Sequence, residues 1–224
     1  GETVVLVTAV MGDKEGNFDY MPLRVDYEER FYAAGKIIGS RFIRREGRPS
    51  EDAILTDRLI DRTIRPLFDE RIRREIQVVA TVLAIDEENA PDFVGMMAAS
   101  AALGISDIPW DGPAAGVRIG KVNGEFVVNP SNQEIQKPEC SFEIFAAGPE
   151  GKINMIELAG KEVDEKDILS AIEIAQKEID ALVEFQKSII KEIGKRKTDV
   201  VLFEIDPQLR ALGEKFLADK LEDA

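Results

Sequence analysis

The strongest helical periodicity in this chain lies near its C-terminal end and constrains the fold more than any other feature. Between residues 166 and 193, apolar side chains recur every three or four positions. These apolar positions are Ile168, Ile172, Ala175, Ile179, Leu182, Ile189 and Ile193. The spacing predicts one long amphipathic helix, with Gly194 just beyond its end. Because such a helix is stable mainly when its apolar stripe is covered, a sheet or a partner must lie against it.

The clearest candidate for a buried strand is residues 75–85. Its sequence, EIQVVATVLAI, is rich in β-branched residues and nearly free of charge. The apolar run within residues 3–10 similarly predicts a central strand. Shorter strands are expected at 21–25, 115–119, 125–128, 141–146 and 153–158.

Capping residues predict two helices in the first third of the chain. Asp26 is expected to cap a helix over residues 26–38, with Gly39 just past its end. Ser50 is expected to cap a second helix, which stops before Pro66.

Two further helices follow from small residues and from proline. Residues 92–103 contain small side chains that allow close approach to a sheet, and Gly104 is expected to end that helix. A last helix is expected to start at Asp206-Pro207. Strands combined with helices packed on a sheet predict an α+β domain of mixed α/β layers.

Composition excludes several classes of function. The chain has no histidine, so histidine-based triads and zinc hydrolysis are excluded within it. A single cysteine, Cys140, excludes an intramolecular disulfide and fits a reducing, cytoplasmic compartment. No apolar stretch is long enough to span a membrane, and no signal peptide with a basic start is visible. We therefore expect a soluble cytoplasmic protein.

Cations are segregated from anions along the chain. The net charge of −14 would repel a polyanion unless the cations were grouped. Arginines concentrate before residue 75, whereas acidic residues dominate the last third. Between Lys36 and Lys121 every cation is an arginine, which suits planar, bidentate recognition of phosphate.

The densest group of arginines is the segment RFIRREGRPS, residues 41–50, which glycine and proline keep out of regular structure. Aromatic faces there could stack on bases while guanidinium groups bind phosphates. The arginines at 58, 62 and 65 follow at spacings of four and three, on one side of the predicted helix. Two alternatives stay open. Asp61, four residues before Arg65, indicates ion pairing, and Phe42 and Ile43 could be core residues.

Residues 40–68, together with VDYEERFYAAG at 25–35, resemble the first ribonuclease PH-like core of the bacterial polynucleotide phosphorylases. In that family, the counterpart of residues 42–45 is a Phe-Phe-Arg-Arg loop that lines the RNA channel. Ile43 replaces the second phenylalanine, which weakens a stacking role there. The resemblance implies a core of the ribosomal protein S5 domain 2-like type over residues 1–203, preceded by strands missing here. Residues 204–224 would begin an all-helical linker.

The resemblance also implies a function. The whole enzyme would degrade RNA from its 3′ end with inorganic phosphate as co-substrate, releasing nucleoside diphosphates. A homotrimer would form a ring of six cores. The magnesium or manganese ions and the chemistry would belong to a second core outside this segment, and other partners would include RNA-degradation machinery. This segment would bind and guide single-stranded RNA. The expected RNA-binding residues are Phe42, Ile43, Arg44, Arg45, Arg48, Arg58, Arg62 and Arg65.

We expect no catalytic and no metal-binding residue in this core. In the family's catalytic core, a Ser-Ser pair begins the small-residue helix, and an Asp-x-Lys arrangement precedes an Ala-Gly turn. Here the helix begins Ala-Pro-Asp92-Phe, and the later strand reads Glu143-Ile-Phe145. Two alternatives stay open. In the first, this core has a phosphorolytic site of its own, with Asp92 or Glu143 holding a metal. In the second, the core is a purely structural component of the ring. Trp110 is interpreted as loop packing, with a base platform as its alternative.

Overall fold

The computed structural model describes residues 1–36, 49–86 and 88–218 and contains two β-sheets with helices between and outside them. Sheet A has the strand order β1-β3-β2, and sheet B has the order β5-β4-β6-β7. The strands are β1 (Val4–Glu15), β2 (Leu23–Glu29), β3 (Arg74–Ala84), β4 (Ala114–Val122), β5 (Glu125–Val128), β6 (Cys140–Pro149) and β7 (Met155–Gly160). The helices are η1 (Phe31–Ala34), α1 (Glu51–Ile64), η2 (Arg65–Leu67), α2 (Pro91–Ile105), α3 (Asn132–Ile135), α4 (Glu165–Ile193) and α5 (Pro207–Ala218).

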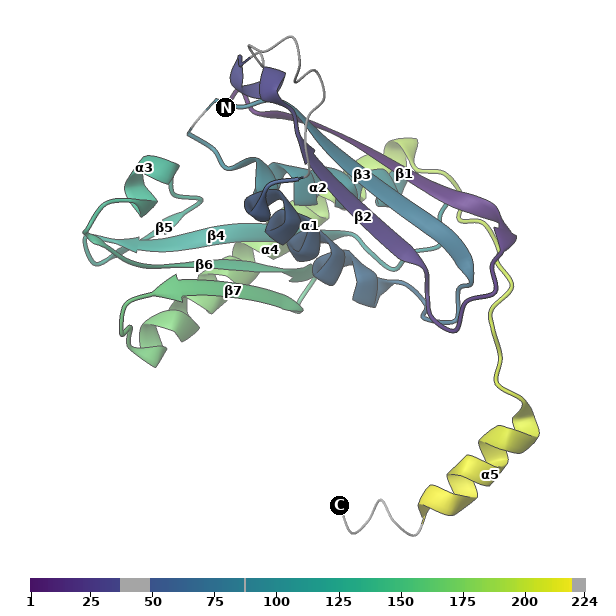
Figure 1. Cartoon of the computed structure of the whole chain (residues 1–224). Helices are drawn as coiled ribbons and strands as arrows, with labels where there is room; N and C mark the ends of the chain where they lie inside the picture. Colours follow the sequence, from purple (N-terminus) through teal and green to yellow (C-terminus); the bar gives the residue numbers. More distant parts are fainter. Residues whose placement is uncertain (37–48, 87, 219–224) are drawn as a thin grey trace.

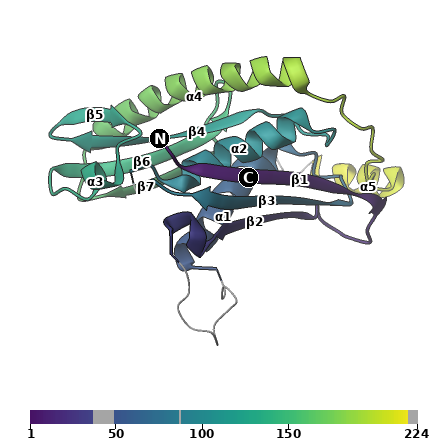
Figure 2. The same ribbon diagram turned by 90° about the horizontal axis from the view of Figure 1, so that it is seen from above.

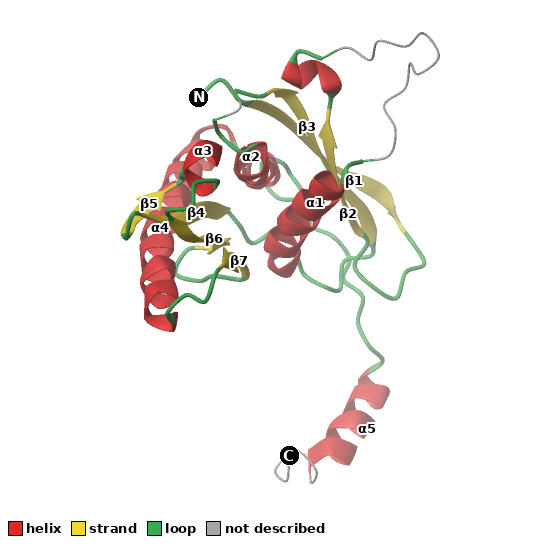
Figure 3. Ribbon diagram, turned by 60° about the vertical axis from the view of Figure 1, so that its left-hand side comes forward, coloured by secondary structure: helices red, strands yellow, loops and turns green. Residues whose placement is uncertain are grey.

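These elements form layers that confirm the predicted mixed α/β class. Helices α1 and α2 lie between the two sheets (Figures 1 and 3). Helix α4 covers the opposite face of sheet B, on the side away from sheet A (Figure 2). In sheet A, β1 is antiparallel and β2 parallel to β3, whereas all pairs in sheet B are antiparallel.

Each sheet buries one apolar core against helices. Between sheet A and helices α1 and α2 lie large side chains such as Ile60, Val78 and Met96, none of which is exposed. The second core joins sheet B to α4, as the amphipathic stripe requires. Its fully buried members are Ala115, Val117, Ile119, Ile144, Ala146, Ala171, Ala175, Ile179 and Val183.

The predicted helix over residues 26–38 is wrong in its described part. Residues 23–29 form strand β2, in which Leu23, Val25 and Tyr27 are buried and alternate with more exposed residues. This period of two places one face of β2 on the core beside β3, and pairing with a buried strand outweighs the local capping signal of Asp26.

The predicted roles of β1 and of Gly104 also need correction. Strand β1 is an edge strand of sheet A rather than a central one, and its Leu6 and Val10 are more than half exposed. Gly104 does not end α2 but lies buried within it, where an added Cβ would be 2.5 Å from Cδ1 of Ile190 in α4. Gly194 directly follows the last residue of α4, as predicted, and its backbone is extended.

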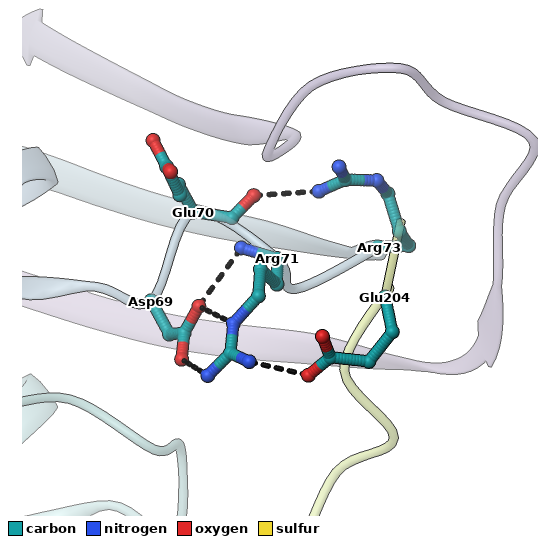
Figure 4. Close-up of polar contacts among 5 residues, drawn as sticks. All are labelled: Asp69, Glu70, Arg71, Arg73 and Glu204. Carbon is teal, nitrogen blue, oxygen red and sulfur yellow. Dashed lines mark hydrogen bonds and ion pairs between the residues drawn. The ribbon is translucent and has the colours of Figure 1, made fainter. Parts of the chain in front are cut away.

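After α4, the connector returns to the body of the molecule before α5 begins. Lys197 Nζ donates to the carbonyl oxygens of Leu103, Gly104 and Ser106 at 2.7–3.1 Å, and so caps the end of α2. Arg71 bonds both Asp69 and Glu204, which ties the connector to the turn before β3 (Figure 4). Helix α5 has no buried residue and is set apart from the layers (Figure 1).

Candidate nucleic-acid interface

Helix α1 begins where the arginine-rich segment ends. Its N-cap is Ser50, as predicted, and the Ser50 side chain accepts a hydrogen bond from the backbone N–H of Ala53 at 3.1 Å. Five of the predicted RNA-binding residues lie outside the described residues, so their predicted role stays a prediction. They are Phe42, Ile43, Arg44, Arg45 and Arg48.

Arg58 and Arg62 lie one turn apart on α1, and both are exposed. Within the described part of the chain, neither of them forms a hydrogen bond or an ion pair with another side chain. Their guanidinium groups therefore have donors available to a ligand. This is the geometry expected if α1 extends the positive surface of the preceding segment.

Arg65 has a different environment from the other two arginines. Its Nε donates to Oδ2 of Asp61 at 2.8 Å, and its Nη2 donates to the carbonyl oxygen of Leu23 at 3.1 Å. The ion-paired alternative therefore holds for Arg65, which joins the end of α1 to the start of β2. Its donors are largely used within the protein, so few of them remain available to a ligand.

Asp57 adds an unfavourable negative charge beside these arginines. Partial burial, followed by the nearby carboxylates of Asp61 and Asp26, raises the pKa of Asp57 to about 6. Arg58 opposes this shift but does not cancel it. The folded chain therefore binds a proton at Asp57 more tightly than the unfolded chain does.

This shift predicts that Asp57→Asn stabilises the fold at high pH. A carboxyl group whose pKa is raised on folding costs stability as the pH rises, here between about pH 4 and pH 6. After discounting for solvent screening, we expect a gain of about 1 kcal/mol at pH 8 and no gain below pH 4. Urea unfolding of both proteins across this range measures it. An equal gain at every pH would mean that the charge of Asp57 is not the cause.

A second polar cluster joins the start of α2 to sheet B. Asp92, at the start of α2, accepts a bond from Nη2 of Arg118 in β4 at 2.6 Å. Nε of Arg118 lies 3.6 Å from Oε2 of Glu143 in β6. The three side chains are 16%, 20% and 29% exposed, respectively. A single guanidinium group thus lies between two carboxylates.

Sheet register puts these groups on one face of sheet B. Arg118 is opposite Phe145 and Gly120 is opposite Glu143, so the side chains of residues 118, 143 and 145 share that face. Phe145 is almost fully buried in the core and carries no charge. The start of α2 and the strand that contains Glu143 therefore meet at Arg118.

The surroundings of this cluster are acidic. Asp92 and Arg118 line an open cavity of about 350 Å³ whose wall includes three further carboxylates, Glu29, Asp52 and Glu157. Burial raises the pKa of Glu29, and the hydrogen bond from the Tyr27 hydroxyl opposes this shift. An entering phosphate would compete with Asp92 and Glu143 for the same guanidinium group. This cavity therefore offers poor complementarity to an anion.

Two acidic side chains near sheet B, Glu134 and Glu143, are engaged in contacts within the protein. Glu134 forms a capping box with Ser131 at the start of α3. Glu143 lies beside Arg118. Among the described residues, no three His, Cys, Asp or Glu side chains are grouped so that they could hold a metal ion. No described helix is long and apolar enough to cross a membrane.

Trp110 is a packing residue, as interpreted from the sequence. It is only 8% exposed, and its Nε1 donates to the carbonyl oxygen of Ile64 at 3.1 Å. Its ring lies 6.2 Å from that of Phe68, centroid to centroid. The indole therefore covers the end of α1 and is not presented to a base.

Arg118 is the functional-site residue that sequence reasoning missed. It is the one charged side chain near the centre of β4, whose other residues are nearly all apolar or glycine. A lone arginine in a buried strand must have an anionic partner nearby, and this signal could have identified it. The identity of that partner, 26 residues away in sequence, could not be read from the pattern.

Two domain models of one protein family match the chain. They are the 3′ exoribonuclease family domain 1, over residues 1–109, and domain 2, over residues 112–178. The polyribonucleotide nucleotidyltransferase of Geobacillus kaustophilus is 49% identical over 211 residues, which cover 94% of this chain and 29% of that protein. The polyribonucleotide nucleotidyltransferase of Heliobacterium modesticaldum is 46% identical over 226 residues, with coverages of 100% and 31%. The chain thus spans less than a third of these curated relatives.

A solved structure shares the fold. Rice (Oryza sativa) Rrp46 superposes with a TM-score of 0.65 and covers 85% of this chain and 84% of its own. The two sequences are 16% identical, so this likeness bears on the fold alone. It agrees with the layered arrangement of sheets A and B around α1 and α2.

Proposed function

This chain belongs to the 3′ exoribonuclease family, and we propose that it forms part of a polyribonucleotide nucleotidyltransferase that degrades RNA from the 3′ end. In phosphorolysis, an oxygen of inorganic phosphate attacks the last phosphodiester linkage of the RNA. The bond from that phosphorus to the O3′ of the preceding nucleotide breaks, and a nucleoside diphosphate leaves. Catalysis therefore requires a site that holds two anions close together, with cations or a metal ion to offset their charge.

Within that enzyme, we assign to this core the binding and guidance of single-stranded RNA rather than cleavage. The observation that carries this assignment is the pairing of Arg118 with both Asp92 and Glu143. Among the described residues, it leaves an acidic cavity without a free cation, in a place where a phosphorolytic core needs positive charge. By contrast, Arg58 and Arg62 are exposed on the helix that follows the arginine-rich segment.

The remaining parts of the proposal concern the whole protein. A second core of the same chain would supply the catalytic groups and bind Mg²⁺ or Mn²⁺. Three chains would form a ring in the cytoplasm, where RNA-degradation machinery is a further partner. Residues 204–224 would begin the helical linker to that second core. The exposed apolar side chains of α5, including Leu209, Leu212 and Leu217, support this role because they need a covering partner.

The test is the salt dependence of RNA binding by the full-length protein. Each phosphate contact by a cation adds about 0.7 to the slope of log affinity against log salt for a single strand. Arg44→Ala combined with Arg45→Ala should therefore lower the slope by about 1.4 and weaken binding at low salt. Titration of a fluorescent oligoadenylate at several salt concentrations measures both.

A matched control removes two other cations. Lys195 and Arg196 are adjacent and exposed in the connector, so their double alanine variant has the same change in net charge. We expect it to leave the slope nearly unchanged. An unchanged slope in the Arg44/Arg45 variant would favour the purely structural ring component. Release of nucleoside diphosphate by this chain alone, with oligoadenylate, phosphate and Mg²⁺, would instead favour a phosphorolytic site of its own at Asp92 or Glu143.

A further inference from the structure

A short helical turn beside the arginine-rich segment presents aromatic side chains to solvent. In η1, which follows β2, Phe31 is 48% and Tyr32 56% exposed, while Ala33 is buried beneath them. Other aromatic side chains of the described chain contribute to its cores, for example Tyr27, at 3% exposure. Exposure of the large, flat tyrosine ring to water is unfavourable in the free protein. This suggests that a ligand covers the ring.

The backbone of this turn is held rigidly. Gly35 adopts a left-handed conformation, with φ of 66°, and its N–H bonds the carbonyl oxygen of Tyr32 at 3.0 Å. The N–H of Lys36 bonds the carbonyl oxygen of Phe31, also at 3.0 Å. Ile85, just after β3, donates to the carbonyl oxygen of Ala33 at 3.1 Å. The ring of Tyr32 is thus mounted on a fixed support, which reduces the entropy lost when a ligand binds.

The position of the turn relates it to the proposed RNA interface. Lys36 and Pro49, the residues that flank segment 37–48, both line one open cavity of about 460 Å³. Phe31 lines the same cavity, so the chain leaves and re-enters the described body beside η1. In Figure 1, η1 lies at the end of sheet A where the parallel strands β2 and β3 both end. An RNA strand held by the arginines would therefore pass close to this turn.

The charges next to Tyr32 favour a nucleic acid over an apolar protein surface. Lys36 is exposed and follows Tyr32 by four residues. Arg30 forms an ion pair with Glu28. The negative charge of Glu28 is therefore partly neutralised and repels an anion less. A ring bordered by charged side chains gives little continuous apolar area for protein docking, but one ring face suffices for one base.

We propose that Tyr32 is a stacking platform for a base of single-stranded RNA, with Lys36 beside it to contact the adjoining phosphate. This inference rests on the proposed function, because the strand must first be held by the arginine-rich segment. Since every base has a flat π-face, such a platform would increase affinity without selecting a sequence.

Binding of a fluorescent oligoadenylate to the full-length protein tests the proposal. Tyr32→Ala should weaken binding by roughly 5- to 150-fold, the range for loss of one base–aromatic stack. The slope of log affinity against log salt should stay unchanged, because no phosphate contact is lost. Tyr32→Phe keeps the ring and should bind like the wild type. Tyr20→Ala is the matched control, since Tyr20 is 58% exposed but lies at the other end of β2.

Comparison with the Arg44/Arg45 double variant separates this inference from the proposed function. If the double variant weakens binding and Tyr32→Ala does not, the Tyr32 inference is wrong and the proposed function stands. If neither variant changes binding, both fail. Analytical ultracentrifugation of each variant adds one further criterion. Loss of the native oligomeric state in Tyr32→Ala would place the ring in a protein interface and overturn the stacking role.

Discussion

Replacing Arg118 with methionine is expected to destabilise this chain by about 3 kcal/mol at pH 8. Methionine matches the length of the arginine stem but removes the charge between Asp92 and Glu143. Both carboxylates would remain largely buried, close together and without a cation. Removing one partner of a buried pair costs more than the pair contributes, because the desolvation of the remaining charge is no longer offset.

A neutral combination of substitutions identifies the cause. Adding Asp92→Asn and Glu143→Gln to Arg118→Met should recover most of the stability at pH 8, because no unpaired charge remains. Urea unfolding, followed by far-ultraviolet circular dichroism, measures each free energy.

Arg24→Met is the matched control for this experiment. Arg24 also pairs with a carboxylate, Asp26, at 2.9 Å, but its side chain is 73% exposed. A surface pair contributes at most about 1 kcal/mol, so this control should change stability little. Equal losses in the two variants would mean that the Arg118 cluster is not a buried ionic network. The Arg118 cluster would then give no reason to exclude phosphate binding in this cavity.

Local signals predicted those elements in which sequence and tertiary packing agree. The stripe of α4 and the cap of α1 at Ser50 are examples, since the same residues that favour the helix also face the core or satisfy its end. Asp26 shows the opposite case. Its carboxylate accepts from Gln77 Nε2 at 2.9 Å across sheet A instead of capping a helix. Pairing with β3 decided the conformation there, and a strand partner about fifty residues away is not visible in a local pattern.

In the candidate site too, local contacts could be predicted from the sequence and contacts between distant elements could not. Spacing alone indicated that Asp61 could pair with Arg65, because residues four apart on a helix are neighbours. The contact of Arg118 with Asp92 joins a strand of sheet B to the start of α2, so it depends on how the layers are stacked. Tyr32 could not be identified because its exposure follows from the end of β2, which the sequence assigned to a helix. In each case, the feature that could not be predicted depends on elements that are far apart in the sequence.

Replacing Trp110 with alanine is expected to have the largest effect on the fold, a loss of about 3 to 5 kcal/mol. The indole fills the space between α1 and the loop after α2, against Phe68, which is itself only 7% exposed. Gly112 adapts to this ring, since an added Cβ there would lie 2.1 Å from Cζ3 of Trp110. Alanine would remove most of the packing and leave a cavity that these neighbours cannot fill without moving.

A second substitution separates packing from the hydrogen bond and from any contact with RNA. Trp110→Phe keeps an aromatic ring but leaves the carbonyl oxygen of Ile64 without its donor, so we expect a smaller loss of about 1 to 3 kcal/mol. In thermal and urea unfolding, the stability should be lowest for Trp110→Ala, intermediate for Trp110→Phe and highest for the wild type. In the full-length protein, Trp110→Phe should bind oligoadenylate with unchanged affinity where it is fully folded. Weaker binding by this folded variant would contradict the assignment of Trp110 to packing alone and restore its role as a base platform.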